Sequence, residues 1–177
     1  MHDISWIPRI CVALVGLVAA FPAEATTAEY VGSAKCKMCH SAEFKAWEET
    51  THANAFTNLK AGDQKDVVRV AQRMKVTLTG PAFESAACVI CHVTGYGLAG
   101  GYPATGGENT AAVAAVGCES CHGPGSLHVS APKAEKKKFT SKTVPAKLCL
   151  QCHTPAVSPE FNYEEMLQKG AHPKTAG

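Results

Sequence analysis

The chain has 177 residues, and its 17 lysines and arginines against 15 aspartates and glutamates give a formal net charge of +2 at pH 7. A charge this close to balance does not indicate nucleic-acid binding, and a chain of this length indicates one main domain. Aromatic residues make up 7% of the chain, so side chains alone would build a thin core. We therefore expect something besides side chains in the interior.

The start of the chain differs from the rest. A positively charged residue precedes an apolar run, and the letters "AEA" then give the small-x-small pattern that signal peptidase recognises. We predict a cleaved export leader over 1–25, which removes Cys11, and a single domain over 26–177 located in the periplasm. The apolar run is shorter than the roughly 20 residues that a membrane span needs, so no transmembrane anchor is expected after cleavage.

Four pentapeptides of one pattern recur along the remaining chain: "CKMCH", "CVICH", "CESCH" and "CLQCH". This pattern is the signature of c-type haem attachment, because each thiol can add to one vinyl group of a porphyrin and the following histidine then lies beneath the iron. The sequence therefore predicts four covalently bound haem c groups. The attaching cysteines are Cys36, Cys39, Cys88, Cys91, Cys118, Cys121, Cys149 and Cys152, and the proximal ligands are His40, His92, His122 and His153.

Other uses of paired cysteines fit less well. Two CxxC pairs can form a four-cysteine zinc site, but such a site does not require a histidine after each pair. A thioredoxin-like dithiol usually occurs once beside a βαβ pattern, and a disulfide framework has no reason to repeat one pentapeptide. The haem interpretation also supplies the interior that the side chains lack.

Three histidines outside the leader belong to no motif: His52, His128 and His172. Electron-transfer haems usually carry two strong axial ligands, so we expect these three as distal ligands, although each could be an ordinary core or surface residue. One iron is then left without a distal histidine. The spacing does not say which histidine serves which haem.

Between the motifs, apolar periodicity predicts a helix over 41–59, which carries His52, and another over 66–76. Met74 on the second helix could cap the remaining iron, but core packing is its more ordinary role. The glycine-rich run over 95–107 could let the backbone approach a flat porphyrin closely or be a plain surface loop.

The second half of the chain has shorter elements. Gly123, Pro124 and Gly125 predict a turn, and a short helix should end at Gly170, just before His172. The marked charge run could dock an acidic partner or be a solvated face. It consists of Lys133, Lys136, Lys137, Lys138 and Lys142.

The segments "KCKMCHSAEFKAWEETTHANAF", "CVICHVTGYGLAGGY" and "VGCESCHGPG" resemble the first three haem segments of the tetrahaem cytochrome c-554 family. The resemblance implies a mostly α multihaem cytochrome c fold with four stacked haems, little strand and long irregular loops. It also implies three bis-histidine haems and one five-coordinate haem, with the open iron above His92. Thr154 and Pro155 would lie on its distal side, where this chain has Ala156 in place of the family's aromatic residue.

The resemblance implies an electron carrier with redox partner proteins, namely a hydroxylamine-oxidoreductase-like donor and a membrane-bound or soluble cytochrome acceptor. Two alternatives stay open beside it. An open iron could reduce a small molecule of the nitric oxide type, which would make the chain an enzyme. A subunit of an extracellular conductive filament with four bis-histidine haems would need eight histidines, and the chain has seven outside the leader.

Overall fold

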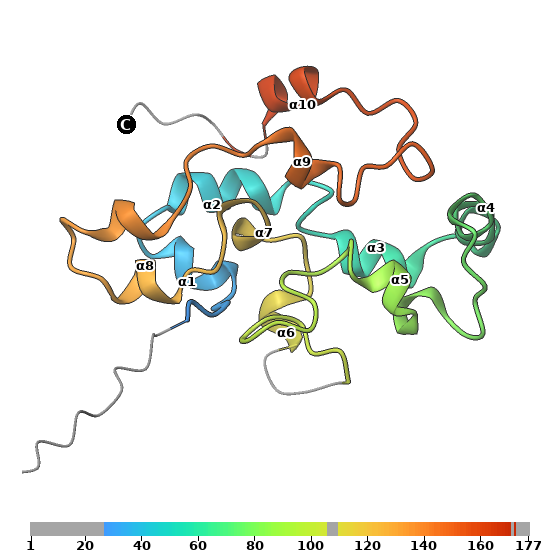
Figure 1. The fold of residues 1–177 in the computed structure, drawn as a ribbon, viewed down its shortest axis with the longest axis horizontal. Coiled ribbons are helices and arrows are strands. Elements are labelled where there is room, and N and C mark those ends of the chain that lie inside the picture. Colours follow the sequence, from blue (N-terminus) through green and yellow to red (C-terminus); the bar gives the residue numbers. More distant parts are fainter. Residues whose placement is uncertain (1–26, 106–109, 171, 173–177) are drawn as a thin grey trace, which may run out of the picture.

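The computed structural model describes residues 27–105, 110–170 and 172, so the predicted leader lies outside the described residues. Within these ranges the chain forms short helices joined by long loops, and no strand (Figure 1). The prediction of a mostly α fold with little strand and irregular loops is confirmed. The helices are α1 (Ser33–Lys37), α2 (Ser41–Glu48), α3 (Ala55–Ala61), α4 (Gln64–Met74), η1 (Ala82–Glu84), α5 (Ala86–Val89), α6 (Thr110–Val113), α7 (Cys118–His122), α8 (Ser126–Ser130), η2 (Lys136–Phe139), α9 (Ala146–Cys149) and α10 (Tyr163–Lys169).

Helix α4 follows the predicted apolar pattern and stands at one end of the molecule (Figure 1). The Asp63 side chain accepts a hydrogen bond from the Lys65 N–H at 2.8 Å, which caps the first turn. Ala71 is buried and Met74 is half-buried on the same face. Lys75 ends the helix in the left-handed conformation, at φ 57°.

The prediction of one continuous helix over 41–59 is wrong. The chain leaves the helical path after α2 because the Thr50 hydroxyl competes with the backbone: it donates to the Trp47 carbonyl at 2.7 Å and accepts from the Ala53 N–H at 3.3 Å. His52 therefore lies in a turn between α2 and α3.

The apolar core is small. Among the described residues, the buried apolar side chains are Phe44, Ala55, Phe56, Ala71, Ala82, Val89, Val93 and Val113. Phe56, Val89 and Val93 form a cluster beside α3 and α5, against which Leu59, Phe83, Tyr96, Tyr102 and Ala114 pack. Such a core is thin for a chain of this length, as its composition predicts.

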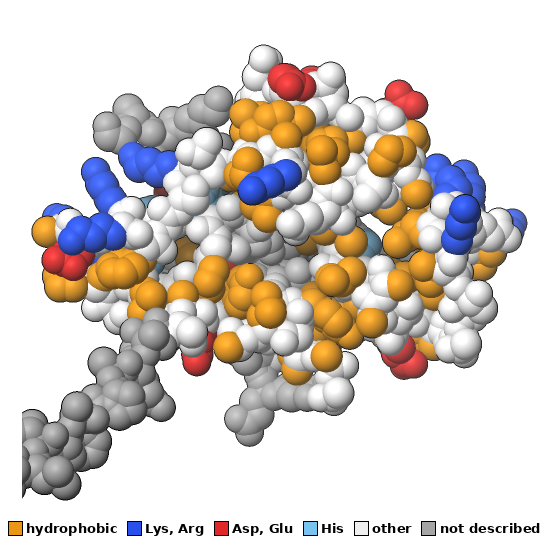
Figure 2. All heavy atoms as spheres, in the orientation of Figure 1, with side chains coloured by type: hydrophobic (Ala, Val, Ile, Leu, Met, Phe, Trp, Pro, Cys, Tyr) orange, Lys and Arg blue, Asp and Glu red, His pale blue; other side chains and the backbone are white. Residues whose placement is uncertain are grey.

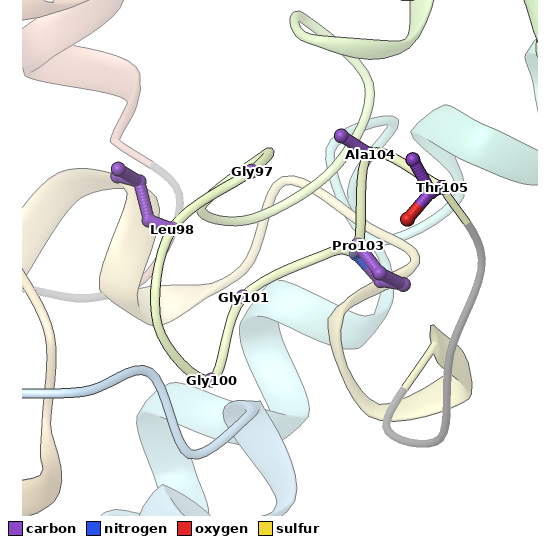
Figure 3. Close-up of a pocket in the computed structure, with 7 residues that line it drawn as sticks. All are labelled: Gly97, Leu98, Gly100, Gly101, Pro103, Ala104 and Thr105. Atoms are coloured by element: carbon purple, nitrogen blue, oxygen red, sulfur yellow. The ribbon is translucent and has the colours of Figure 1, made fainter.

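The glycine-rich run wraps around Tyr30. The Tyr30 N–H donates to the Ala99 carbonyl at 3.0 Å. A Cβ on Gly95 would lie 2.6 Å from the Tyr30 ring, and one on Gly100 would overlap the Tyr30 backbone. Both glycines also have positive φ, so the backbone can double back as Figure 3 shows. Residues 106–109 of the run lie outside the described residues.

None of the helices in the described ranges is long and apolar enough to cross a membrane. On the face shown in Figure 2, lysine and arginine side chains gather at two opposite ends of the molecule, one over α4 and the other over α8 and η2. Apolar side chains spread over the surface between these ends (Figure 2).

Candidate haem-binding site

Each of the four motifs folds into a single helical turn. In the first and fourth motifs the histidine N–H donates to the carbonyl of the motif's first cysteine, at 2.9 Å in both. In the second motif the His92 N–H donates to the Val89 carbonyl at 2.8 Å, and the third motif is the whole of α7. Because residues three and four apart share a helix face, each turn presents its two cysteines and its histidine toward one side.

Cysteines of different motifs lie beside each other in two pairs. The hydrogen bond between the thiols of Cys36 and Cys118 raises the pKa of Cys36 and lowers the pKa of Cys118 to about 6. A second such bond lowers the pKa of Cys91 to about 7 and raises the pKa of Cys152. These pKa values belong to free thiols, because a thioether sulfur carries no proton. The first motif therefore adjoins the third, and the second adjoins the fourth.

The third and fourth motifs are also neighbours. Burial raises the pKa of Cys121, and the charges of Cys149 and Cys118 add to this effect. The four motifs thus follow each other in space in the order first, third, fourth, second, which differs from their order along the chain.

Each of the three histidines outside the motifs lies against a motif histidine. The pairs are His40 with His128 at 6.2 Å between ring centroids and 33° between ring planes, His52 with His153 at 5.9 Å and 67°, and His122 with His172 at 6.0 Å and 30°. When two imidazole nitrogens bind the same metal ion from opposite sides, each at about 2 Å, their ring centroids lie about 6 Å apart. All three pairs have this separation.

The Nδ1 atoms of several of these rings are held by hydrogen bonds. Such a bond fixes the ring and leaves Nε2 as the nitrogen that can bind a metal. Backbone carbonyls accept from Nδ1 in three rings: Ala55 for His92 at 2.8 Å, Ser141 for His122 at 2.6 Å and Lys136 for His128 at 2.9 Å. Nδ1 of His153 shares a hydrogen bond of 3.0 Å with the Ser158 hydroxyl, in which either atom can be the donor.

The protonation of the His52 and His153 pair suits metal binding. Burial lowers the pKa of His52, and the nearby His153 lowers it further. Burial also lowers the pKa of His153, whose ring stacks on Phe161 with 4.5 Å between centroids. Both rings therefore favour the neutral form, which is the form that ligates iron.

His92 is the motif histidine left over when the three pairs are formed. Its Nδ1 bond to Ala55 joins the second motif to the start of α3. Thr154 and Pro155, expected from the resemblance near the open iron, lie in the turn after the fourth motif, where the Thr154 N–H donates to the Cys152 carbonyl at 3.0 Å. The hydrogen bond between the thiols of Cys91 and Cys152 brings this turn beside the second motif.

Three buried polar side chains that hold α7 in place were not predicted from the sequence: Ser33, Thr94 and Glu119. The Ser33 hydroxyl accepts from the Cys118 N–H at 3.1 Å, and the Thr94 hydroxyl accepts from the Gly117 N–H at 2.9 Å. One signal was present in the sequence: "CESCH" is the motif with an acidic residue between its cysteines.

The residues present fit haem c better than the alternatives. All eight cysteines of the four motifs are free thiols, as thioether formation requires. Among the described residues, no three histidine, cysteine, aspartate or glutamate side chains converge as a zinc site would need. The paired rings and the one-turn motifs supply axial nitrogens and attaching sulfurs for a metalloporphyrin.

Repeated CxxCH turns and paired histidine rings in a helical fold define a multihaem c-type cytochrome. The family model described as "Cytochrome c554 and c-prime" matches residues 35–123, half of the chain, and a model of a doubled CXXCH motif matches residues 111–158. The chain belongs to the cytochrome c554 family, and its CxxCH motifs imply covalently bound haem c.

One relative agrees with this assignment in both sequence and structure. The chain is 32% identical over 162 residues to cytochrome c-554 of Nitrosomonas europaea, a match that covers 83% of this chain and 64% of the relative. It thus spans less than two thirds of that relative's length. The solved reduced state of cytochrome c554 from Nitrosomonas europaea superposes with a TM-score of 0.61 at 27% identity, over 82% of this chain and 84% of the other.

Proposed function

We propose that this chain is an exported tetrahaem c-type cytochrome that carries electrons between redox partners in the periplasm. When bound, haem c supplies an iron that takes up and releases one electron. The observation that carries the proposal is the set of three histidine pairs, each with the separation that one shared iron requires. Ligands held on both sides change position little as the charge of the iron changes, which suits electron transfer.

The proposal assigns ligands that the sequence could not pair. His40 and His128 would hold one iron, His153 and His52 a second, and His122 and His172 a third, with the eight motif cysteines attaching the four porphyrins. Support comes from the backbone carbonyls that accept from Nδ1 of His122 and His128, because these bonds leave Nε2 of both rings for ligation.

The remaining haem, attached at the second motif by Cys88 and Cys91, would be five-coordinate with His92 as its ligand. Its open side favours a second candidate function, the binding and reduction of a small molecule of the nitric oxide type. A reduction that consumes protons normally needs an acidic side chain near the bound molecule. The three histidines outside the motifs are already proposed as iron ligands and cannot supply this proton, so electron transfer is the primary function and the reductase the alternative.

Partner proteins would dock at the lysine segment 133–142. The segment contains five lysines and one acidic residue, Glu135. The Glu135 carboxylate lies 3.5 Å from Lys138 Nζ. Part of this basic end is visible over η2 in Figure 2. The segment also holds two proposed iron ligands, through the Lys136 carbonyl on His128 and the Ser141 carbonyl on His122.

A redox partner with an acidic surface therefore fits this end of the molecule. By family resemblance, the donor would be a hydroxylamine-oxidoreductase-like protein and the acceptor a membrane-bound or soluble cytochrome.

The test uses the purified holoprotein. Intact mass spectrometry should give the chain from residue 26 with four haem masses added. Low-temperature electron paramagnetic resonance of the ferric form should show one high-spin haem in four, and the fully reduced form should bind one equivalent of carbon monoxide. Fewer haems would overturn the tetrahaem proposal. Four low-spin haems with no carbon monoxide bound would be consistent with an electron carrier but would contradict the proposal of an open iron. Met74 would then be tested as the sixth ligand of that iron.

A further inference from the structure

Glu119 is a buried acidic residue inside the third motif. It lies on α7 between Cys118 and Ser120, and only 4% of it is exposed. Carboxylates are seldom this deeply buried unless a cation or hydrogen-bond donors compensate them, because a charge loses its hydration on burial.

Backbone N–H groups provide this compensation. Oε1 of Glu119 accepts from Gly125 at 2.7 Å and from Val31 at 2.9 Å, while Oε2 accepts from Gly32 at 2.8 Å and from Val31 at 3.1 Å. All these partners are donors, which is the arrangement that an ionised carboxylate needs.

These bonds place the charge between two haem-attachment segments. Val31 and Gly32 lead directly into α1, which carries Cys36 of the first motif, and Gly125 follows the third motif. The hydrogen bond between the thiols of Cys36 and Cys118 brings the attaching sulfurs of the two motifs together. Cys118 directly precedes Glu119 in the chain.

No cation neutralises this carboxylate among the described ion pairs, which join Arg69 to Asp66, Lys138 to Glu135 and Lys169 to Glu165. The charge also acts on its surroundings. Burial raises the pKa of Tyr30, and the negative charge of Glu119 raises it further.

We propose that Glu119 is a fixed negative charge that lowers the reduction potentials of the haems attached at the first and third motifs, and that it also locks these two motifs together. This inference rests on the proposed attachment of haem. A negative charge in a poorly hydrated interior favours the more positive ferric iron over the ferrous iron, and water screens it weakly. The second and fourth motifs have no acidic residue between their cysteines and are not joined to Glu119 by these hydrogen bonds, so their haems lack this effect.

The test compares Glu119→Gln with the native holoprotein by spectroelectrochemical titration. The neutral side chain should shift one or two of the four titration components to higher potential and leave the others unchanged, while the thermal midpoint falls. Glu29→Gln neutralises an exposed carboxylate on the same segment, where water screens the charge, and should shift no component. Ser33→Ala removes a neighbouring hydrogen bond without changing charge, and should lower stability alone.

Unchanged potentials in a folded, fully loaded Glu119→Gln protein would overturn the proposal, as would an equal rise in Ser33→Ala. If Glu119→Gln does not assemble, Glu119→Asp decides. Potentials that stay low while the thermal midpoint falls support the role of the charge, and potentials that rise with the lost stability overturn it. Haem content, measured by mass, tests the proposed function separately from the potentials.

Discussion

The rings of His122 and His172 lie 6.0 Å apart between centroids, although one belongs to α7 in the middle of the chain and the other follows α10 near its end. This contact brings the last described segment of the chain to the third motif. In the proposal, one distal histidine fills the sixth coordination position of each paired iron. Removing that histidine should therefore open the position on that iron alone.

His172→Ala should convert the iron held by His122 from six-coordinate to five-coordinate. The reduced variant is then expected to bind two equivalents of carbon monoxide where the native protein binds one, and the high-spin signal should double. His172→Ala with an unchanged carbon monoxide count would show that this pair does not share an iron.

Ser158→Ala should raise the reduction potential of one haem, the one held by His153. Nδ1 of His153 lies 3.0 Å from the Ser158 hydroxyl, which would accept its proton once Nε2 binds iron. Loss of this acceptor makes the imidazole a weaker donor to ferric iron. Redox titration measures the shift, and Ser158→Thr is the matched control because it keeps the hydroxyl. If the alanine and threonine variants titrate alike, the hydrogen bond does not tune this iron.

The motif pattern predicted the attaching cysteines and the proximal histidines because that chemistry is local in sequence. Residues that meet only after folding could not be paired this way: the contact between His52 and His153 depends on the turn after α2, which Thr50 creates inside an apparently helical pattern. Glu119 was overlooked for a related reason, because its partners Val31 and Gly32 are remote in sequence. Periodicity reports which face of a helix is apolar, but it does not report which segments meet.

Substitutions of Lys136 and Lys137 should change the free energy of unfolding by different amounts but slow docking to a similar extent. Lys136 Nζ donates to the carbonyls of His128 at 2.8 Å and Val129 at 2.7 Å, whereas Lys137 is exposed. Lys136→Met should lower the free energy of unfolding by about 1 to 2 kcal/mol, and Lys137→Met by much less. Chemical denaturation measures this difference.

Both lysine variants should react more slowly with an anionic reductant such as dithionite, because each removes one positive charge from the same segment. The difference from the native protein should shrink as ionic strength rises. Stopped-flow reduction at two salt concentrations measures it. Equal rates for native and Lys137→Met proteins at low salt would argue against docking at this end.

Gly100→Ala should destabilise the protein more than Gly97→Ala, although the two glycines have nearly the same φ, 73° and 71°. The left-handed conformation costs a residue with a Cβ about 1 to 2 kcal/mol in either position. At Gly97 the nearest atom to that Cβ is 3.9 Å away, so this cost stands alone. At Gly100 the Cβ would also overlap the backbone of Tyr30, which adds about 1 to 3 kcal/mol of overpacking.

Thermal unfolding of the two alanine variants with haem content held equal measures that difference directly. Tyr30 adjoins both the loop and the Val31 that binds Glu119, so displacement at Gly100 should also disturb the junction of the first and third motifs. Gly100→Ala is therefore expected to change the redox titration, and Gly97→Ala to leave it as in the native protein. Equal stability of the two variants would mean that the contact between the loop and Tyr30 does not hold this junction.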